Sequence, residues 1–186
     1  GMYSWVGSFD IKSSYPHQII TFNISPETLV GKADFINIDS LVKDGLPKTI
    51  ADYSQTNDVS VAANMTFYTK EKRGFFGEIM IEFFNERARW QDILEKAQND
   101  YKTTKTEELK NTISSAGAMQ LAIKLAINAF YGMTANEYSR WYSIDIAEAI
   151  TTSGQLSIKT AEKTINQYMN SILKTNKDYV IAIDTD

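Results

Sequence analysis

EIMIEFFNERARWQDILEKAQND, residues 78–100, carries apolar side chains that recur at helical spacing, and this period predicts one long amphipathic helix. A short polar connection, 101–105, follows it. Thr104 with Glu107 has the form of a capping box, so a second long helix is expected to run from there to about Gly132. Two long helices joined by so short a connection are expected to lie antiparallel, as a hairpin.

The segments around this hairpin complete an α+β fold class. Asp145 with Glu148 opens a third helix, whose apolar and small side chains keep one face as far as Ile172. This helix is expected to lie behind the strands. The other expected elements are a short helix over 18–22 closed by Asn23, a loop over 31–58, and short strands over 59–62 and 65–68.

Two further short apolar segments, 5–11 and 179–183, are expected to be strands that deliver carboxylates to their ends. The first carries Asp10, and the second leads into Asp184 and Asp186. Side chains two apart on a strand point the same way, so the last two carboxylates would project together. Like charges that close repel unless a cation lies between them or one binds a proton. A hard oxygen-ligated metal such as Mg²⁺ is the natural cation, with Asp10 as a candidate partner.

The composition limits the class of protein. With 43% hydrophobic and 23% charged residues among 186, the chain is typical of a soluble globular protein, and a cytoplasmic location is the default expectation. The absence of cysteine excludes disulfides and thiolate metal sites, and the single His17 excludes a multi-histidine site. No apolar run approaches the length of a membrane span, so no membrane partner is expected. The net charge of −4 supplies no overall electrostatic attraction to nucleic acid.

Three polar residues share one face of the second expected helix. Lys124, Asn128 and Tyr131 are spaced i, i+4 and i+7. One interpretation is a solvated stripe on an amphipathic helix. The other is a ligand site, in which the ammonium binds a phosphate beside an amide and an aromatic ring. Arg87 on the neighbouring helix could face Lys124, and the two cations would then form a triphosphate clamp.

Together these residues resemble the sequence motifs of family B DNA polymerases. DIKSSYP, residues 10–16, resembles motif A, KLAINAFYG, residues 124–132, resembles motif B, and IDTD, residues 183–186, resembles motif C. The order of the motifs is that of the family, and the resemblance covers nearly the whole chain. Residues 23–28 and 149–155 are similar specifically to the replicative polymerases of T-even-like bacteriophages.

This resemblance implies a two-metal site. Asp10 and Asp186 would be ligands of two Mg²⁺ ions, with the backbone carbonyl of Ile11 contributing and Asp184 close by as a further catalytic carboxylate. The reaction implied is template-directed transfer of deoxynucleotides, with a deoxynucleoside triphosphate and primer–template DNA as partners.

The resemblance also implies the nucleotide-binding residues. Arg87 and Lys124 would hold the triphosphate, and Lys124 is the proposed proton donor to the departing pyrophosphate. Ser13 and the amides near Ser14 and Tyr15 would bind the β- and γ-phosphates. The Tyr15 ring would lie under the sugar and exclude a 2′-hydroxyl. The residues expected to line the nascent base-pair pocket are Asn128 and Tyr131.

Three parts of a polymerase are expected along the chain: 1–75 as the amino-terminal part of the palm, 76–136 as the fingers hairpin, and 137–186 as the rest of the palm segment. The exonuclease, the rest of the palm and the thumb are expected to be absent from these residues, and the thumb and distal palm would supply most contacts to duplex phosphates. The fragment alone is therefore expected to have little or no activity. Alternatives are a non-catalytic docking segment of a split polymerase, assembled in trans with a separate exonuclease and thumb, or an unrelated helical scaffold that matches by chance.

Overall fold

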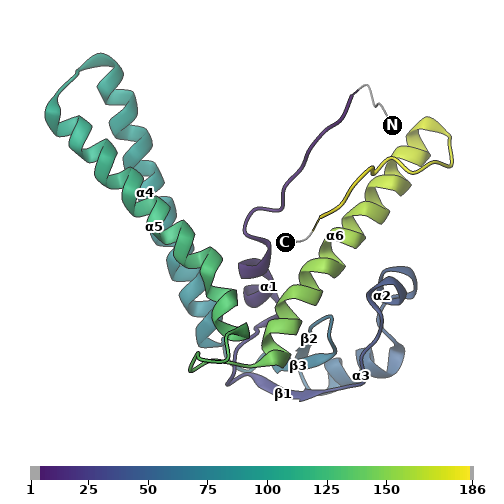
Figure 1. Cartoon of the computed structure of the whole chain (residues 1–186). Coiled ribbons are helices and arrows are strands. Elements are labelled where there is room, and N and C mark those ends of the chain that lie inside the picture. Colours follow the sequence, from purple (N-terminus) through teal and green to yellow (C-terminus); the bar gives the residue numbers. More distant parts are fainter. Residues whose placement is uncertain (1–4, 185–186) are drawn as a thin grey trace.

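The computed structural model describes residues 5–184, which form six α-helices and a three-stranded sheet. Figure 1 shows two long arms, a helical hairpin and a single helix, that diverge from a base made of the sheet and the shorter helices. The predicted α+β class agrees with this mixture of helices and a small antiparallel sheet. The long helices therefore set the shape of the molecule, and the base joins them.

The predicted hairpin is present as α4 (Phe75–Thr103) and α5 (Glu107–Ala135), which pack along each other. Its details differ from the prediction in two places. Thr106, not Thr104, caps α5, and its hydroxyl accepts a hydrogen bond from the Leu109 N–H at 3.3 Å. The expected end near Gly132 is wrong, because this glycine lies inside α5 with helical backbone continuing beyond it. By length and composition alone α5 could also cross a membrane. One such helix is only weak evidence for a membrane span.

The first helix, α1 (Ser14–Phe22), begins earlier than predicted. Pro16 falls in its first turn, where a missing N–H costs no helical hydrogen bond. Asn23 ends it in the left-handed conformation, at φ 58°, as expected of an asparagine cap. The helix is thus bounded by local chemistry at both ends.

Residues 23–28 also cap the start of α4. The Asn23 side-chain oxygen accepts a hydrogen bond from the N–H of residue 74 at 2.8 Å. The Ser25 hydroxyl accepts from the N–H of residue 76 at 3.4 Å, and the Glu27 carboxylate accepts from that of residue 75 at 2.6 Å. The first N–H groups of a helix have no partner within the helix, so these three contacts satisfy groups that would otherwise need water. They fasten the base of the hairpin to the end of α1.

The sheet has the order β1-β3-β2, with β1 (Leu29–Lys32), β2 (Val59–Val61) and β3 (Thr66–Thr69) all antiparallel. The strands β2 and β3 confirm the two short strands that the sequence predicts. In the sheet Tyr68 stands opposite both Leu29 and Ser60, and it is fully buried.

The expected loop over 31–58 is wrong. It contains the end of β1 and two helices, α2 (Ile38–Asp44) and α3 (Lys48–Thr56). Asn37 caps α2 by accepting a hydrogen bond from the Asp39 N–H at 2.8 Å. The abundant polar residues belong to the exposed faces of short helices, of which α2 buries only Ile38 and Leu41.

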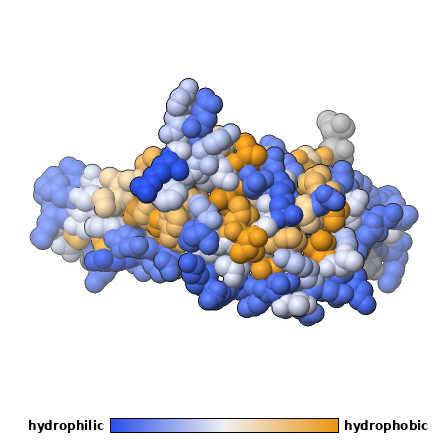
Figure 2. Space-filling view, turned by 90° about the horizontal axis from the view of Figure 1, so that it is seen from below, coloured by the Kyte–Doolittle hydropathy of each residue, from blue (hydrophilic) through white to orange (hydrophobic). Residues whose placement is uncertain are grey.

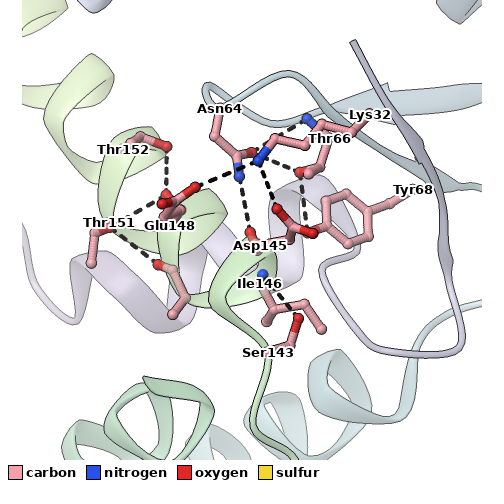
Figure 3. A network of polar contacts seen from close by, with 11 residues as sticks. Lys32, Asn64, Thr66, Tyr68, Ser143, Asp145, Ile146, Glu148, Thr151 and Thr152 are labelled. Atoms are coloured by element: carbon pink, nitrogen blue, oxygen red, sulfur yellow. Dashed lines mark hydrogen bonds and ion pairs between the residues drawn. The ribbon is translucent and has the colours of Figure 1, made fainter. Parts of the chain in front are cut away.

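The third predicted helix is α6 (Ile144–Leu173), and Figure 3 shows how its start is held to the sheet. Lys32 Nζ lies 2.6 Å from Asp145 and 3.5 Å from Glu148. The buried Asn64 donates to the Asp145 carbonyl at 2.9 Å and accepts from the Thr66 hydroxyl at 2.7 Å. Polar contacts from β1, from β3 and from the turn before β3 thus position the first turn of α6.

The hydrophobic core lies where the hairpin, α1, α6 and the sheet meet. A second, smaller cluster packs α2 against the β2–β3 turn. Much apolar surface stays uncovered: in Figure 2 hydrophobic side chains gather in the middle of the lower face, with hydrophilic ones at its ends. The buried residues of the main core are Ile19, Ile24, Ala62, Tyr68, Phe76, Met80, Ile127, Ile146, Ala149 and Ile150.

The two strands expected to carry carboxylates are wrong: residues 5–11 and 179–183 have no strand structure. A strand needs a neighbouring strand for its N–H and C=O groups, and within residues 5–184 the only sheet is that of β1, β2 and β3. The carboxy-terminal segment instead turns back onto α6, where the Tyr179 N–H donates to Asn166 at 2.7 Å.

Candidate active site

Two tyrosines from distant parts of the chain meet at the base of the hairpin. Tyr15 lies on α1 and Tyr131 on the last turns of α5. Their ring centroids are 4.6 Å apart with an interplanar angle of 55°, and both side chains are half-buried. Offset or tilted ring pairs at this distance are favourable. The contact brings together the two segments that carry the first two predicted motifs.

A third element, α6, also contacts Tyr15. Gly154 of α6 lies so near the Tyr15 ring that a Cβ built there would be 2.9 Å from a ring carbon. Ser13 and Ser14 begin α1 beside it, with Ser13 in the left-handed conformation at φ 54° and its carbonyl 2.9 Å from His17 Nδ1. The predicted phosphate-binding residues therefore stand at the start of a helix.

Lys124 and Asn128 lie along α5 toward the tip from Tyr131, and both side chains are exposed. Arg87 of α4 is half-buried, and its Nε is buried with no hydrogen-bond partner. Because the helices are antiparallel and Arg87 and Lys124 are about equally far from the connection at 104–106, they stand at similar levels of the hairpin. Within residues 5–184 neither cation forms a salt bridge.

The carboxylates are not assembled in the part of the chain that the structure describes. Asp10 and Ile11 lie in the exposed segment before α1, and Asp184 is exposed at the other end. Among residues 5–184 no group of three or more acidic or histidine side chains is arranged so that it could hold a metal ion. Asp186 lies outside the described residues. Carboxylate and carbonyl oxygens are the donors that Mg²⁺ prefers, so the residue types fit this ion.

An open depression of about 530 Å³ lies on α4, and it contains none of the predicted site residues. It joins charges of both signs, and Glu86 there accepts from the Trp90 indole at 3.0 Å and pairs with Arg89 at 3.6 Å. These two contacts are made within α4 itself. The residues around it are Arg73, Glu78, Ile81, Glu82, Asn85, Glu86 and Arg89.

Comparison with known proteins decides the family. The family model described as DNA polymerase family B matches residues 1–185. The chain belongs to DNA polymerase family B. The predicted family is thus confirmed, and the alternative of a chance-matching scaffold is wrong.

Relatives within this family include phage enzymes named DNA-directed DNA polymerase. Those of Enterobacteria phage T4 and Escherichia phage RB69 are each 27% identical, over 98% and 99% of this chain. The DNA polymerase 2 of Aeropyrum pernix is 26% identical over 87% of it. The chain spans 24% of the length of each phage relative. The chain thus shares its family with enzymes named for DNA synthesis.

Sequence reasoning missed two features that position the site. The capping of α4 by residues 23–28 had a signal in the run Asn-x-Ser-x-Glu, whose side chains are typical helix caps, but their target lies far along the chain. Gly154 stood out only as a small residue on a helix face. Neither role can be read from spacing, because each depends on which distant element packs there.

Proposed function

We propose that the chain is the palm–fingers part of a template-directed DNA polymerase, with 1–75 and 137–186 as palm and 76–136 as fingers. The family match over residues 1–185 carries this proposal. The contact between Tyr15 and Tyr131 supports it, because it joins the segments that resemble motifs A and B.

The reaction is transfer of a deoxynucleotide to a primer. The primer 3′-hydroxyl loses its proton as its oxygen attacks the α-phosphorus. The bond from that phosphorus to the oxygen bridging to the β-phosphate breaks, and pyrophosphate leaves and accepts a proton. Lys124 is the candidate donor of that proton, since its exposed ammonium lies on the hairpin face that also bears Asn128 and Tyr131.

The triphosphate is held by charge from both hairpin helices. Arg87 and Lys124, which form no salt bridge within residues 5–184, are available to pair with phosphate oxygens. Ser13 and Ser14, with the N–H groups at the start of α1, bind the β- and γ-phosphates. Tyr15 lies under the deoxyribose and excludes a 2′-hydroxyl, and Asn128 and Tyr131 line the base-pair pocket.

Two Mg²⁺ ions complete the proposed site. Asp10, the carbonyl of Ile11 and Asp186 would hold them, with Asp184 nearby. When bound, such ions lower the pKa of the attacking hydroxyl and stabilise negative charge on the phosphates. In the described residues Asp10 and Asp184 are exposed and belong to no acidic cluster, so assembly of the site is expected to accompany binding of nucleotide and DNA.

Primer–template DNA is the proposed macromolecular partner, in the cytoplasm of a bacterial host. The net charge of −4 gives this chain little attraction of its own for duplex phosphates. Such contacts are proposed to come from the part of a polymerase that the relatives have beyond the matched 24% of their length.

A second candidate is a docking segment that acts only when assembled with separate exonuclease and thumb parts. The uncovered apolar side chains favour it. Trp5 and Phe9 are 102% and 91% exposed, and Ile172 and Leu173 at the end of α6 are 55% and 50% exposed. Surface of this kind commonly packs against another domain or chain.

Lysine acetylation with mass spectrometry tests the proposed nucleotide site. Mg²⁺ with dATP is expected to slow acetylation of Lys124 at least several-fold and to leave Lys110, an exposed lysine on the same helix, unchanged. Protection that is equal at both lysines, or absent at both, contradicts the proposal.

A further inference from the structure

The ring of Tyr15 lies against the backbone of α6 at Gly154. A Cβ at this glycine would be 2.9 Å from Cε1 and 3.3 Å from Cδ1 of the ring, and 3.8 Å from the Ser14 hydroxyl oxygen. Ordinary contact with a Cβ begins at about 3.4 Å, so a side chain here requires the ring to move by about half an ångström. Gly154 is buried within a regular helix, where glycine is a poor helix former, so close approach is the physical reason for it.

The helix cannot easily move away from the ring. Ser153 Oγ accepts a hydrogen bond from the Ala63 N–H at 3.1 Å, which ties α6 to the β2–β3 turn. Ser157 Oγ accepts from the Gln18 amide at 3.1 Å, which ties it to α1. Both anchors flank Gly154 along the helix. A side chain added at Gly154 would therefore press on the Tyr15 ring, whose side-chain torsions can turn, more than it would shift the anchored helix.

The Tyr131 ring also packs on Tyr15, with 4.6 Å between the ring centroids. Displacement of Tyr15 away from α6 moves the ring over which the proposed function places the deoxyribose, beside the Tyr131 ring of the base-pair pocket. We propose that Gly154 is a positioning residue for sugar selection: its missing side chain lets the Tyr15 ring rest on α6 and keeps room for a deoxyribose. This inference rests on the proposed function.

The test compares Gly154→Ala with Gly117→Ala in the 186-residue chain. Gly117 is also a helical glycine, but a Cβ there meets nothing within 4 Å. Dissociation constants for dATP and ATP are measured with Mg²⁺ by calorimetry. G154A is expected to weaken dATP binding about tenfold and to change ATP binding little, because small displacements in a tight site are costly. G117A is expected to keep the wild-type preference.

Two further measurements separate positioning from a general structural effect. Nuclear Overhauser contacts between the Tyr15 ring and the Gly154 α-protons report the ring position, and G154A is expected to shift the ring resonances while circular dichroism stays unchanged. In a Tyr15→Ala background, Gly154→Ala is expected to cause no further loss of dATP affinity. An equal loss in that background means that the effect passes through α6 itself, and it overturns the inference.

The outcomes distinguish this inference from the proposed function. A wild-type chain that prefers dATP, together with a G154A variant that shows the same preference, overturns the inference alone. Unshifted Tyr15 resonances in G154A overturn it as well. A wild-type chain that binds neither nucleotide contradicts the proposed function, and the role in sugar selection falls with it.

Discussion

The side-chain oxygen of Asn23 accepts a hydrogen bond from the Gly74 N–H at 2.8 Å, joining the end of α1 to the start of α4. The same side chain donates to the carbonyls of Thr69 and Lys72, at 2.7 and 2.8 Å. Gly74 itself has no room for a side chain, because a Cβ would lie 2.5 Å from that of Ser25. One amide therefore connects α1, the end of β3 and the base of the hairpin.

Replacement of Asn23 by glycine is expected to lower the free energy of unfolding by about 2 kcal/mol, because three backbone groups, two of them in partly buried hydrogen bonds, lose this partner. Asn23→Ala should cost about 1 kcal/mol more, since alanine is strained at the φ of 58° found there. Urea unfolding measures both. Asn111→Ala, at an exposed position of α5, serves as the control and should stay within about 0.5 kcal/mol of wild type. Equal effects of the three variants would contradict the capping role.

Glu27 makes the same junction sensitive to acid. Partial burial acts to raise the pKa of Glu27, but hydrogen bonds from the Ser25 hydroxyl and the Phe75 N–H outweigh it and lower the pKa below its usual 4.5. A depressed carboxylate pKa stabilises the fold above about pH 4.5, and this contribution disappears as the pH falls through the folded-state pKa.

Glu27→Gln is therefore expected to be less stable than wild type at pH 7, by about 0.5–1 kcal/mol for a largely exposed cap. The difference should shrink as the pH is lowered past 4.5, because the wild-type carboxylate is then protonated too. Urea unfolding at a series of pH values measures this. A difference that stays constant down to pH 3 would show that the charge of Glu27 has no part in capping α4.

The polar contacts at the start of α6 are expected to differ greatly in weight. Asn64 is 1% exposed, and Asn64→Ala removes two hydrogen bonds, one to the Asp145 carbonyl and one from the Thr66 hydroxyl, so it should cost about 2 kcal/mol. Lys32→Met removes an ion pair whose side chains are 38% and 47% exposed, and it should cost about 0.5 kcal/mol. Thermal unfolding of the two variants checks this order, and the reverse order would contradict it.

Lys124→Ala is expected to weaken binding of a deoxynucleoside triphosphate about tenfold or more, since a charge-assisted contact to phosphate is lost. Lys110→Ala on the same helix is the matched control and should bind as wild type does. Calorimetric titration with dATP and Mg²⁺ measures both variants. An unchanged affinity of Lys124→Ala would remove this lysine from the proposed triphosphate clamp.

The purified chain by itself is expected to extend a primer slowly or not at all. It spans 24% of the length of its phage relatives, and its described carboxylates Asp10 and Asp184 are exposed and unclustered. A gel assay with labelled primer–template and Mg²⁺ tests this. Processive primer extension by the chain alone would contradict this prediction.

Most of the correct predictions rest on local sequence patterns. The hairpin and α6 follow from a 3.6-residue period that persists over many turns, and this signal needs no distant partner. The ends of these helices are harder to predict, because they depend on where neighbouring elements cease to pack against the helix. The loop predicted over 31–58 failed for a related reason: α2 and α3 are short and bury few side chains, so their period is hidden by polar composition.

The strands predicted over 5–11 and 179–183 failed because a local pattern does not show whether a strand has a neighbour. Their apolar residues satisfy a strand pattern, but a strand exists only beside another strand. The residues that would hold metal therefore agree with the motifs in type and order, while the described structure leaves Asp10 and Asp184 apart from any acidic cluster.

By itself, the sequence determined the family, the long helices and the order of the motif residues, because period and spacing are properties of neighbouring positions. Only the tertiary structure decided that residues 23–28 cap α4 and that Tyr15 lies against both Tyr131 and Gly154. Those relationships join segments far apart in the chain. They depend on the packing of whole helices, which no local pattern records.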